Sequence, residues 1–115
     1  MLKRSILAVS MLAAAGCANR GPSLPPPAQV SPAERQVLRD QVRGHAKTHC
    51  GVCHQSTLPT AKPGALAIFD LDAPDWTATL KAEHLPGFLR RLNARLGDSD
   101  QRTLRAFIAS ERAVR

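Results

Sequence analysis

The sequence Cys-Gly-Val-Cys-His at residues 50–54 constrains the fold of this chain more than any other feature. Two thiols at this spacing match the two vinyl groups of a porphyrin, with which they can form thioether bonds. The histidine beside the second thiol can then reach the iron from one face of the ring. The motif therefore predicts one covalently attached haem c, with Cys50 and Cys53 as its thioether residues and His54 as the proximal iron ligand.

Three other interpretations of residues 50–54 compete with haem: a redox dithiol, half of a zinc site and a structural disulfide. A thioredoxin-like dithiol is typical of a chain with a βαβ unit, which this sequence does not indicate. Zinc prefers four ligands at separated positions, whereas these three residues crowd onto one turn. The spacing favours haem over these alternatives.

The composition also favours a small domain with a large apolar group at its centre. The chain has 115 residues, which predicts one domain and excludes a multidomain enzyme. Its aromatic residues are one Trp and three Phe, so a core made of side chains alone is expected to be thin. A porphyrin would fill such a core.

Residues 1–16 have the organisation of a secretory signal peptide. Lys3 and Arg4 precede an apolar run over residues 6–15, which is too short to cross a bilayer stably as a mature helix. We therefore expect the protein to be exported to the bacterial periplasm. Export also favours haem, because c-type haem is attached outside the bacterial cytoplasm and a free cysteine pair would tend to oxidise there.

Residues 14–17, Ala-Ala-Gly-Cys, resemble the bacterial lipobox, in which small residues precede a cysteine that is acylated and becomes the new N-terminus. The resemblance implies that Cys17 is lipidated and anchors the protein to the inner or the outer membrane. The sequence departs from the lipobox at Ala14, where Leu is usual, and the nearest leucine is Leu12. The alternative is ordinary cleavage nearby, which would leave Cys17 free and the protein soluble in the periplasm.

Residues 17–30 are predicted to tether the folded domain to the lipidated Cys17. Residues 18–30 contain four Pro and no apolar periodicity, so we expect them to be extended and solvated. At roughly 3 Å per residue, a Pro-rich chain of this length would hold the domain up to about 40 Å from its anchor. The alternative is a frayed N-terminus without a spacing role.

Residues 31–115 are predicted to form an all-α domain, and its first helix is clearly marked. Ser31 is expected to cap this helix, with Pro32 in the first helical position and Glu34 completing a capping-box pattern. The helix should lead directly into the motif. Its apolar stripe consists of Val37, Leu38, Val42 and Ala46.

The middle of the chain is predicted to contain one short apolar run and one further helix. Residues 65–69 are expected to form a buried loop or a short strand. A helix capped by Asp72 should present Trp76 and Leu80 on one face and stop before Pro86.

Two more helices are expected before the C-terminus. The first should be closed by Gly97 as its C-cap, and its apolar residues are Phe88, Leu89, Leu92 and Leu96. Asp98 and Gln101 have capping-box spacing and should open the last helix. The apolar face of that helix consists of Leu104, Phe107 and Ile108.

With the motif and the helix that runs into it, residues 33–113 resemble the class I cytochromes c, small electron carriers with one haem. Ala46 stands where that family packs its first helix against its last, and residues 104–108 look like the family's C-terminal helix face. The resemblance implies that the N- and C-terminal helices pack around a covalently bound haem. It also implies that the protein is an electron carrier rather than an enzyme: a periplasmic, membrane-anchored c-type cytochrome that passes single electrons between redox partner proteins.

The sequence departs from that family at the sixth iron ligand, which is usually a Met between the motif and the last helix. Met1 and Met11 both lie in the predicted signal peptide, so the mature chain has no Met. His84 is the leading candidate for the distal ligand, because it lies in the stretch expected to cross the distal face. A solvated side chain at a helix end is the alternative for His84. Lesser candidates for the ligand are Lys62, Lys81, His45 and His49.

The family also fixes the proximal histidine through a backbone carbonyl near a proline, which accepts the proton of the second ring nitrogen. Such a contact would set the orientation of the His54 imidazole. The resemblance implies that the segment near Pro59 or Pro63 supplies this carbonyl, although neither spacing matches the family cleanly.

The chain is basic, with a formal net charge of +7, and arginines gather towards its C-terminus. A basic face there can steer an acidic redox partner or lie on anionic lipid, and the alternative is a plain solubilising surface. Nucleic acid is not expected as a partner of an exported chain. The arginines of this face are Arg90, Arg91, Arg95, Arg102, Arg105, Arg112 and Arg115.

Two functions other than electron transfer stay open. The absent Met favours a haem-based sensor or small-ligand binder, in which an open or weak sixth site takes up a gas or peroxide and peroxidase-like activity becomes an option. A lipoprotein without haem, which binds partners and contains a structural disulfide, is the other alternative. The ligand at the sixth iron position separates the sensor from the electron carrier, and a missing Soret band would favour the lipoprotein.

Overall fold

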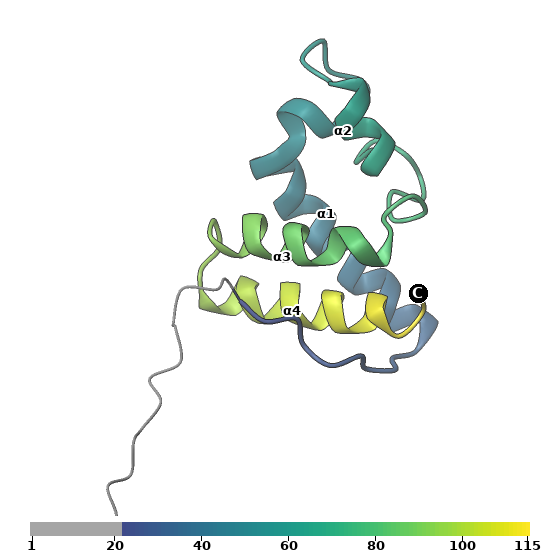
Figure 1. Ribbon diagram of the computed structural model, residues 1–115, viewed down its shortest axis with the longest axis vertical. Helices are drawn as coiled ribbons and strands as arrows, with labels where there is room; N and C mark the ends of the chain where they lie inside the picture. The colour runs from purple at the N-terminus through teal and green to yellow at the C-terminus, as the bar shows by residue number, and fades with distance from the viewer. Residues whose placement is uncertain (1–21) are drawn as a thin grey trace, which may run out of the picture.

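The computed structural model describes residues 22–115, and every regular element in that range is a helix (Figure 1). The prediction of an all-α domain is therefore confirmed. None of these helices combines the length and the apolar character that crossing a bilayer requires. The predicted signal peptide and Cys17 lie outside the described residues. The elements are α1 (Pro32–His54), α2 (Pro63–Ile68), the 3₁₀ helix η1 (Ala82–His84), α3 (Leu85–Asn93) and α4 (Asp98–Arg112).

Helix α1 begins where the sequence predicts and ends with the cysteine motif. The Ser31 hydroxyl caps it by accepting a hydrogen bond from the backbone N–H of Glu34 at 3.1 Å. Because α1 continues to His54, the motif forms its last turns rather than a loop that follows it. Val42 and Ala46 are fully buried in the core.

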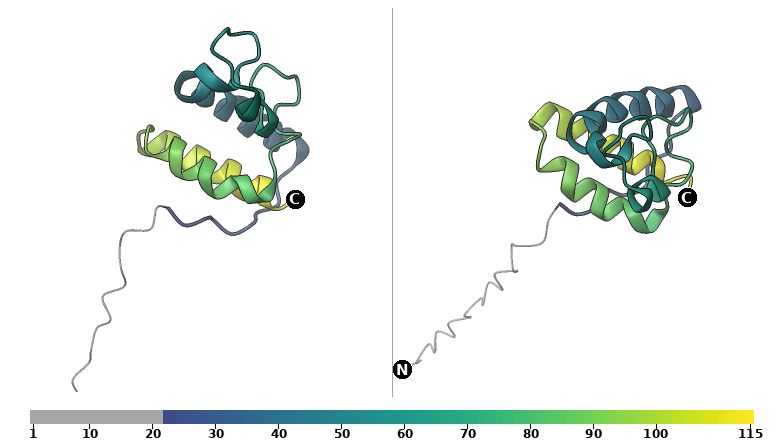
Figure 2. Two further views of the ribbon diagram at one scale, coloured as in Figure 1. Left: turned by 45° about the horizontal axis from the view of Figure 1, so that its top comes forward. Right: turned by 90° about the horizontal axis from the view of Figure 1, so that it is seen from above.

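Helices α3 and α4 run antiparallel and side by side, and α1 crosses them (Figure 1; Figure 2). The predicted packing of the first helix against the last is confirmed by the contact between α1 and α4. Apolar side chains fill the space between these three helices, because each presents one apolar face to the others. Those that are at most 1% exposed are Val42, Ala46, Leu85, Leu89, Leu92, Leu104, Phe107 and Ile108.

The four aromatic residues of the chain form one cluster in this core. Ring centres of the neighbouring pairs lie 5.4 to 6.0 Å apart. Phe107 comes from α4 and Phe88 from α3, whereas Phe69 and Trp76 come from the chain between α2 and η1. The cluster therefore joins the irregular middle of the chain to the helices.

Several helix ends differ from their predictions. Residues 65–69 belong mostly to α2 rather than to a buried loop or strand, because Pro63 occupies a first turn where its missing N–H is not needed. Gly97 caps the start of α4 and not the end of α3. Asp98 is the first residue of α4, and the Gln101 side chain donates to two carbonyls at and after the end of α3, so the expected capping box is not formed.

The helix expected after Asp72 is absent, and residues 71–79 form turns instead. The Asp72 carboxylate does not cap a helix, because it accepts hydrogen bonds from the chain that follows the motif. Backbone carbonyls of the same region accept hydrogen bonds from Arg43 and Arg115. The two apolar side chains predicted for the face of this helix are buried nonetheless.

The proline-rich segment at residues 22–30 is extended and mostly exposed, as expected, but it is held on the folded domain. It runs along α4 (Figure 1), where the N–H of Ala28 donates to a carbonyl at 3.0 Å and Arg112 donates to the carbonyl of Pro25 at 2.5 Å. Pro25 is buried. The expectation of a spacer that holds the domain away from its anchor is therefore wrong for residues 22–30, because these residues are docked on α4.

Candidate functional site

The last turns of α1 carry the cysteine pair. Cys50 and Cys53 stand three residues apart on the helix, so their side chains project from neighbouring positions on one face. Both thiols are free, and both residues are partly exposed. Gly51 between them is buried, whereas Val52 is 66% exposed. The pair can therefore react with a group that approaches from the solvent side.

The charges around the cysteine pair come from α3 and the chain that follows it. Burial raises the pKa of the Cys50 thiol, and the positive charges of Arg95 and Arg91 oppose this effect. The Cys50 thiol is therefore protonated at neutral pH. Both arginines are exposed, so part of the predicted basic face lies beside the motif.

The His54 imidazole is held by the segment that follows α2. Its Nδ1 lies 3.0 Å from the carbonyl oxygen of Phe69, and its ring stacks on the Phe69 ring with centres 3.7 Å apart. A carbonyl only accepts hydrogen bonds, so Nδ1 carries the proton and Nε2 of the neutral ring keeps its lone pair. The carbonyl comes from Phe69, and the expectation that the segment near Pro59 or Pro63 supplies it is wrong.

Further hydrogen bonds fix this segment against the chain after the motif. The backbone N–H of Leu71 donates to the carbonyl of His54 at 2.8 Å. Hydrogen bonds from Thr57 and Gln55 lower the pKa of Asp72 to about 2, and a hydrogen bond from Ser56 lowers the pKa of Asp70. Both carboxylates are therefore ionised at neutral pH, in the state that accepts these bonds.

His84 lies at the end of η1, where its ring has partners of its own. Its Nδ1 accepts a hydrogen bond from the backbone N–H of Lys81 at 3.1 Å, and its Nε2 lies 3.7 Å from the carboxylate of Glu83. Acceptance at Nδ1 places the proton of a neutral ring on Nε2. His84 would have to change this tautomer to bind iron through Nε2, and its role as distal ligand stays a prediction.

The lesser candidates for the distal ligand are spread over the surface. The Nε2 atom of His45 lies 3.4 Å from the carboxylate of Asp100, and the others, His49, Lys62 and Lys81, are exposed. Within residues 22–115 no group of three or more His, Cys, Asp or Glu side chains is arranged to hold a metal ion. The structure therefore assembles no four-ligand zinc site in this range.

Trp76 is a buried donor without an acceptor, which the sequence analysis did not single out. The residue is only 2% exposed, and its ring packs on Phe107 and against the edge of Phe69. No atom of the described residues accepts a hydrogen bond from its Nε1. A buried indole N–H usually finds a partner, so this donor marks a place where a bound group with an acceptor would be stabilised. The one feature of the sequence that could have drawn attention to this residue is that it is the single Trp of the chain.

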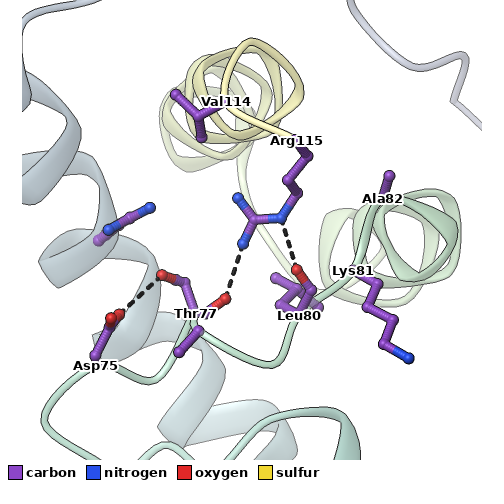
Figure 3. A pocket seen from close by; sticks show the side chains of 9 residues that line it. Asp75, Thr77, Leu80, Lys81, Ala82, Val114 and Arg115 are labelled. Atoms are coloured by element: carbon purple, nitrogen blue, oxygen red, sulfur yellow. Dashed lines mark hydrogen bonds between the residues drawn. The ribbon is translucent and has the colours of Figure 1, made fainter.

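Two surface cavities lie away from the motif. One, of about 530 Å³, is bordered by Thr77, Leu80 and Arg115, and Arg115 donates to the carbonyls of Leu80 and Thr77 at 2.6 and 2.8 Å (Figure 3). The other, of about 490 Å³, lies between the start of α1 and α4 and is bordered by Val37 and Leu38. None of the three motif residues borders either cavity.

In comparisons with protein-family models, curated proteins and solved structures, no match to this chain was found. The chemistry of the site therefore has to be argued from its own geometry. It offers two free thiols, an oriented imidazole with an available Nε2 and a buried N–H donor. The sequence did not predict the site roles of Phe69, Asp70, Asp72 and Trp76, because these roles depend on contacts between distant parts of the chain.

Proposed function

We propose that this protein is a c-type cytochrome, similar to the class I family, that carries single electrons through one haem attached to Cys50 and Cys53. The observation that carries the proposal is the hydrogen bond between Nδ1 of His54 and the Phe69 carbonyl. This bond fixes the tautomer and the orientation of the ring that directly follows the cysteine pair. An imidazole held in this way presents Nε2 to a metal and is a more basic ligand.

The other residues around the motif also suit a haem. Each free thiol can add across one vinyl group, so that a carbon–sulfur bond forms and the thiol hydrogen moves to the other vinyl carbon. The Nε1 of Trp76 is a donor for which a haem carboxylate is a suitable acceptor. When bound, haem supplies a reversible one-electron change between ferric and ferrous iron.

The protein is further proposed to act in the bacterial periplasm, anchored to a membrane through a lipidated Cys17. The support is the order of charged, apolar and small residues that precede Cys17. Because residues 22–30 are docked on α4, only residues 17–21 separate this anchor from the folded domain. A chain of five residues spans at most about 18 Å, so the domain would stay near the lipid surface.

The proposed electron partners are proteins with acidic surfaces. Arg91 and Arg95 lie beside the partly exposed cysteine pair, where an approaching partner would meet them. Opposite charges on the two surfaces would steer the encounter and would act more weakly at high salt.

A haem-based sensor of small ligands is the second candidate. The observation that favours it is the hydrogen bond between His84 Nδ1 and Lys81, together with the absence of Met from residues 17–115. If His84 ligates the iron, the protein should be low-spin, and His84→Ala should make it high-spin and able to bind carbon monoxide readily. A wild type that is already high-spin and binds carbon monoxide at once would favour the sensor, measured by absorbance of the oxidised and reduced protein.

The proposal is tested by haem staining after expression with the c-type maturation machinery. The wild type should keep its haem stain on a denaturing gel, and Cys50→Ala with Cys53→Ala should abolish it, because both thioether bonds are lost. A denaturing gel makes the result independent of folding. Val52→Ala is the matched control, since it changes an exposed residue between the two cysteines without removing a thiol and should leave the stain unchanged. Stain that survives the double substitution, or a wild type without stain, would contradict the proposal.

A further inference from the structure

The contact between His54 and Phe69 is one of several bonds that hold residues 54–57 and 69–72 together. We propose that Asp72 is a positioning residue that holds the Phe69 carbonyl against Nδ1 of His54 and thereby sets the reduction potential of the iron. This inference rests on the proposed function.

The two segments meet at both ends and in the middle. At one end His54 Nδ1 donates to the Phe69 carbonyl at 3.0 Å, and in the middle the N–H of Leu71 donates to the His54 carbonyl at 2.8 Å. At the other end Thr57 donates to Asp72 from its hydroxyl at 2.6 Å and from its backbone N–H at 3.0 Å. Asp72 follows Phe69 by three residues, and Thr57 follows His54 by three residues. The Thr57–Asp72 bonds therefore hold the two segments together three residues beyond the contact between His54 and Phe69.

Asp72 takes part in more of the hydrogen bonds between these two segments than any other residue. Its second oxygen accepts a hydrogen bond from Nε2 of Gln55 at 3.1 Å, and Nζ of Lys47 lies 3.8 Å away. Its own backbone N–H donates to Asp70, which also accepts the N–H of Ser56 at 3.2 Å. Hydrogen bonds to ionised groups are stronger than those between neutral groups. The bonds to the Asp72 carboxylate should therefore hold the two segments together more strongly than the bonds between neutral groups do.

The chemical consequence follows from the proton on Nδ1. Donation from Nδ1 to a carbonyl makes the imidazole a more basic ligand. A more basic ligand stabilises ferric over ferrous iron, so a firm contact lowers the potential. If the Phe69 carbonyl moves away, the potential should rise.

The test compares Asp72→Ala with Asp40→Ala in the haem-loaded protein. Asp40 is an exposed carboxylate on α1 whose side chain is bonded to Gln36, so its loss changes the net charge equally without touching this contact. Solvent exchange of the His54 Nδ1 proton, followed by NMR, should become about tenfold faster in Asp72→Ala. The midpoint potential should move to more positive values, and both quantities should stay at wild-type values in Asp40→Ala.

Thr57→Val provides a second variant if Asp72→Ala does not load haem. It removes the hydroxyl donor at nearly constant volume and should shift both quantities in the same direction by a smaller amount. Asp72→Asn keeps an acceptor and should restore most of the exchange protection. A wild type without haem overturns the proposed function together with this inference. A loaded wild type whose Asp72→Ala and Thr57→Val variants match Asp40→Ala in both quantities overturns this inference alone.

Discussion

Two regions of the molecule are held together in different ways. The helical frame, which is α1, α3 and α4, is joined by buried apolar side chains. The connecting segment, residues 55–81, contains one short helix and buries apolar side chains in the same core, but its irregular backbone is held in addition by polar side chains from the helices and the C-terminus. The proposed iron ligand His54 stands where the two regions meet.

Helix α1 serves both regions because it carries a basic stripe beside its apolar one. Residues at a spacing of four share a side of a helix, and Arg39, Arg43 and Lys47 follow this spacing. Arg39 pairs with the buried Glu111 of α4, Arg43 donates to carbonyls of the connecting segment and Lys47 lies near Asp72. The difference teaches that an irregular segment needs polar contacts to its backbone in addition to buried side chains, and that one helix can supply both.

The largest expected effect comes from Phe107→Ala, which breaks the helical frame. Phe107 is fully buried on α4 against Trp76 and Phe88. Removal of a buried Phe side chain costs about 4 kcal/mol, from lost burial and from the cavity left behind. Urea denaturation of the purified protein should show this loss, and Val37→Ala, at a position that is 55% exposed, should change the free energy of unfolding by less than about 0.5 kcal/mol. Equal effects of the two substitutions would refute the role of burial in the frame.

Glu111→Ala should have the next largest effect, because Glu111 joins the two regions. Its buried carboxylate accepts hydrogen bonds from Arg39 and Arg115, and Arg115 also holds the carbonyls of Thr77 and Leu80. Loss of one partner from a buried ion pair costs about 3 kcal/mol. Amide exchange at Leu80 should also become faster.

Asp98→Ala is the matched control for Glu111→Ala, since it removes an exposed carboxylate from the first turn of the same helix. It should cost about 0.5 kcal/mol through the helix dipole. Unchanged exchange at Leu80 in Glu111→Ala would show that Arg115 holds the connecting segment without Glu111.

The smallest expected effect is a pH dependence confined to the connecting segment. The pKa of Asp72 is lowered to about 2 in the folded protein, mainly by hydrogen bonds from Thr57 and Gln55. The stability from this carboxylate is therefore fully present above about pH 4, near the ordinary pKa of Asp, and is lost as the pH falls through the lowered value. Urea denaturation of wild type and Asp72→Asn across this range should show a steeper loss for the wild type. Parallel curves would contradict the role of the ionised carboxylate.

The helical frame could be predicted from the sequence because its signals are local. Ser31, Pro32 and Glu34 mark the start of α1, and apolar spacing marks the faces that meet in the core. The connecting segment could not be predicted, because its conformation depends on Arg43 and Arg115, which lie far away in the sequence. Asp72 is of a residue type that often caps helices, but its carboxylate accepts hydrogen bonds from Thr57 instead.

The candidate site also has a part that the sequence predicts and a part that only the structure shows. Cys50, Cys53 and His54 lie within five residues of one another, so the sequence alone predicts that their side chains lie close together. The partner of His54 was misplaced near Pro59 or Pro63, since a backbone carbonyl leaves no mark in the sequence. Phe69 is identified only by the structure, through its carbonyl and its ring.

Mass spectrometry of the denatured, purified wild type tests the central claim most directly. After expression with the c-type maturation machinery, the chain should carry the mass of one haem in addition to any lipid on Cys17. Digestion should place the added mass on the peptide that contains residues 50–54, because the thioether bonds survive denaturation. A peptide of residues 50–54 with its unmodified mass, or haem that is released when the protein is denatured, would contradict covalent attachment at Cys50 and Cys53.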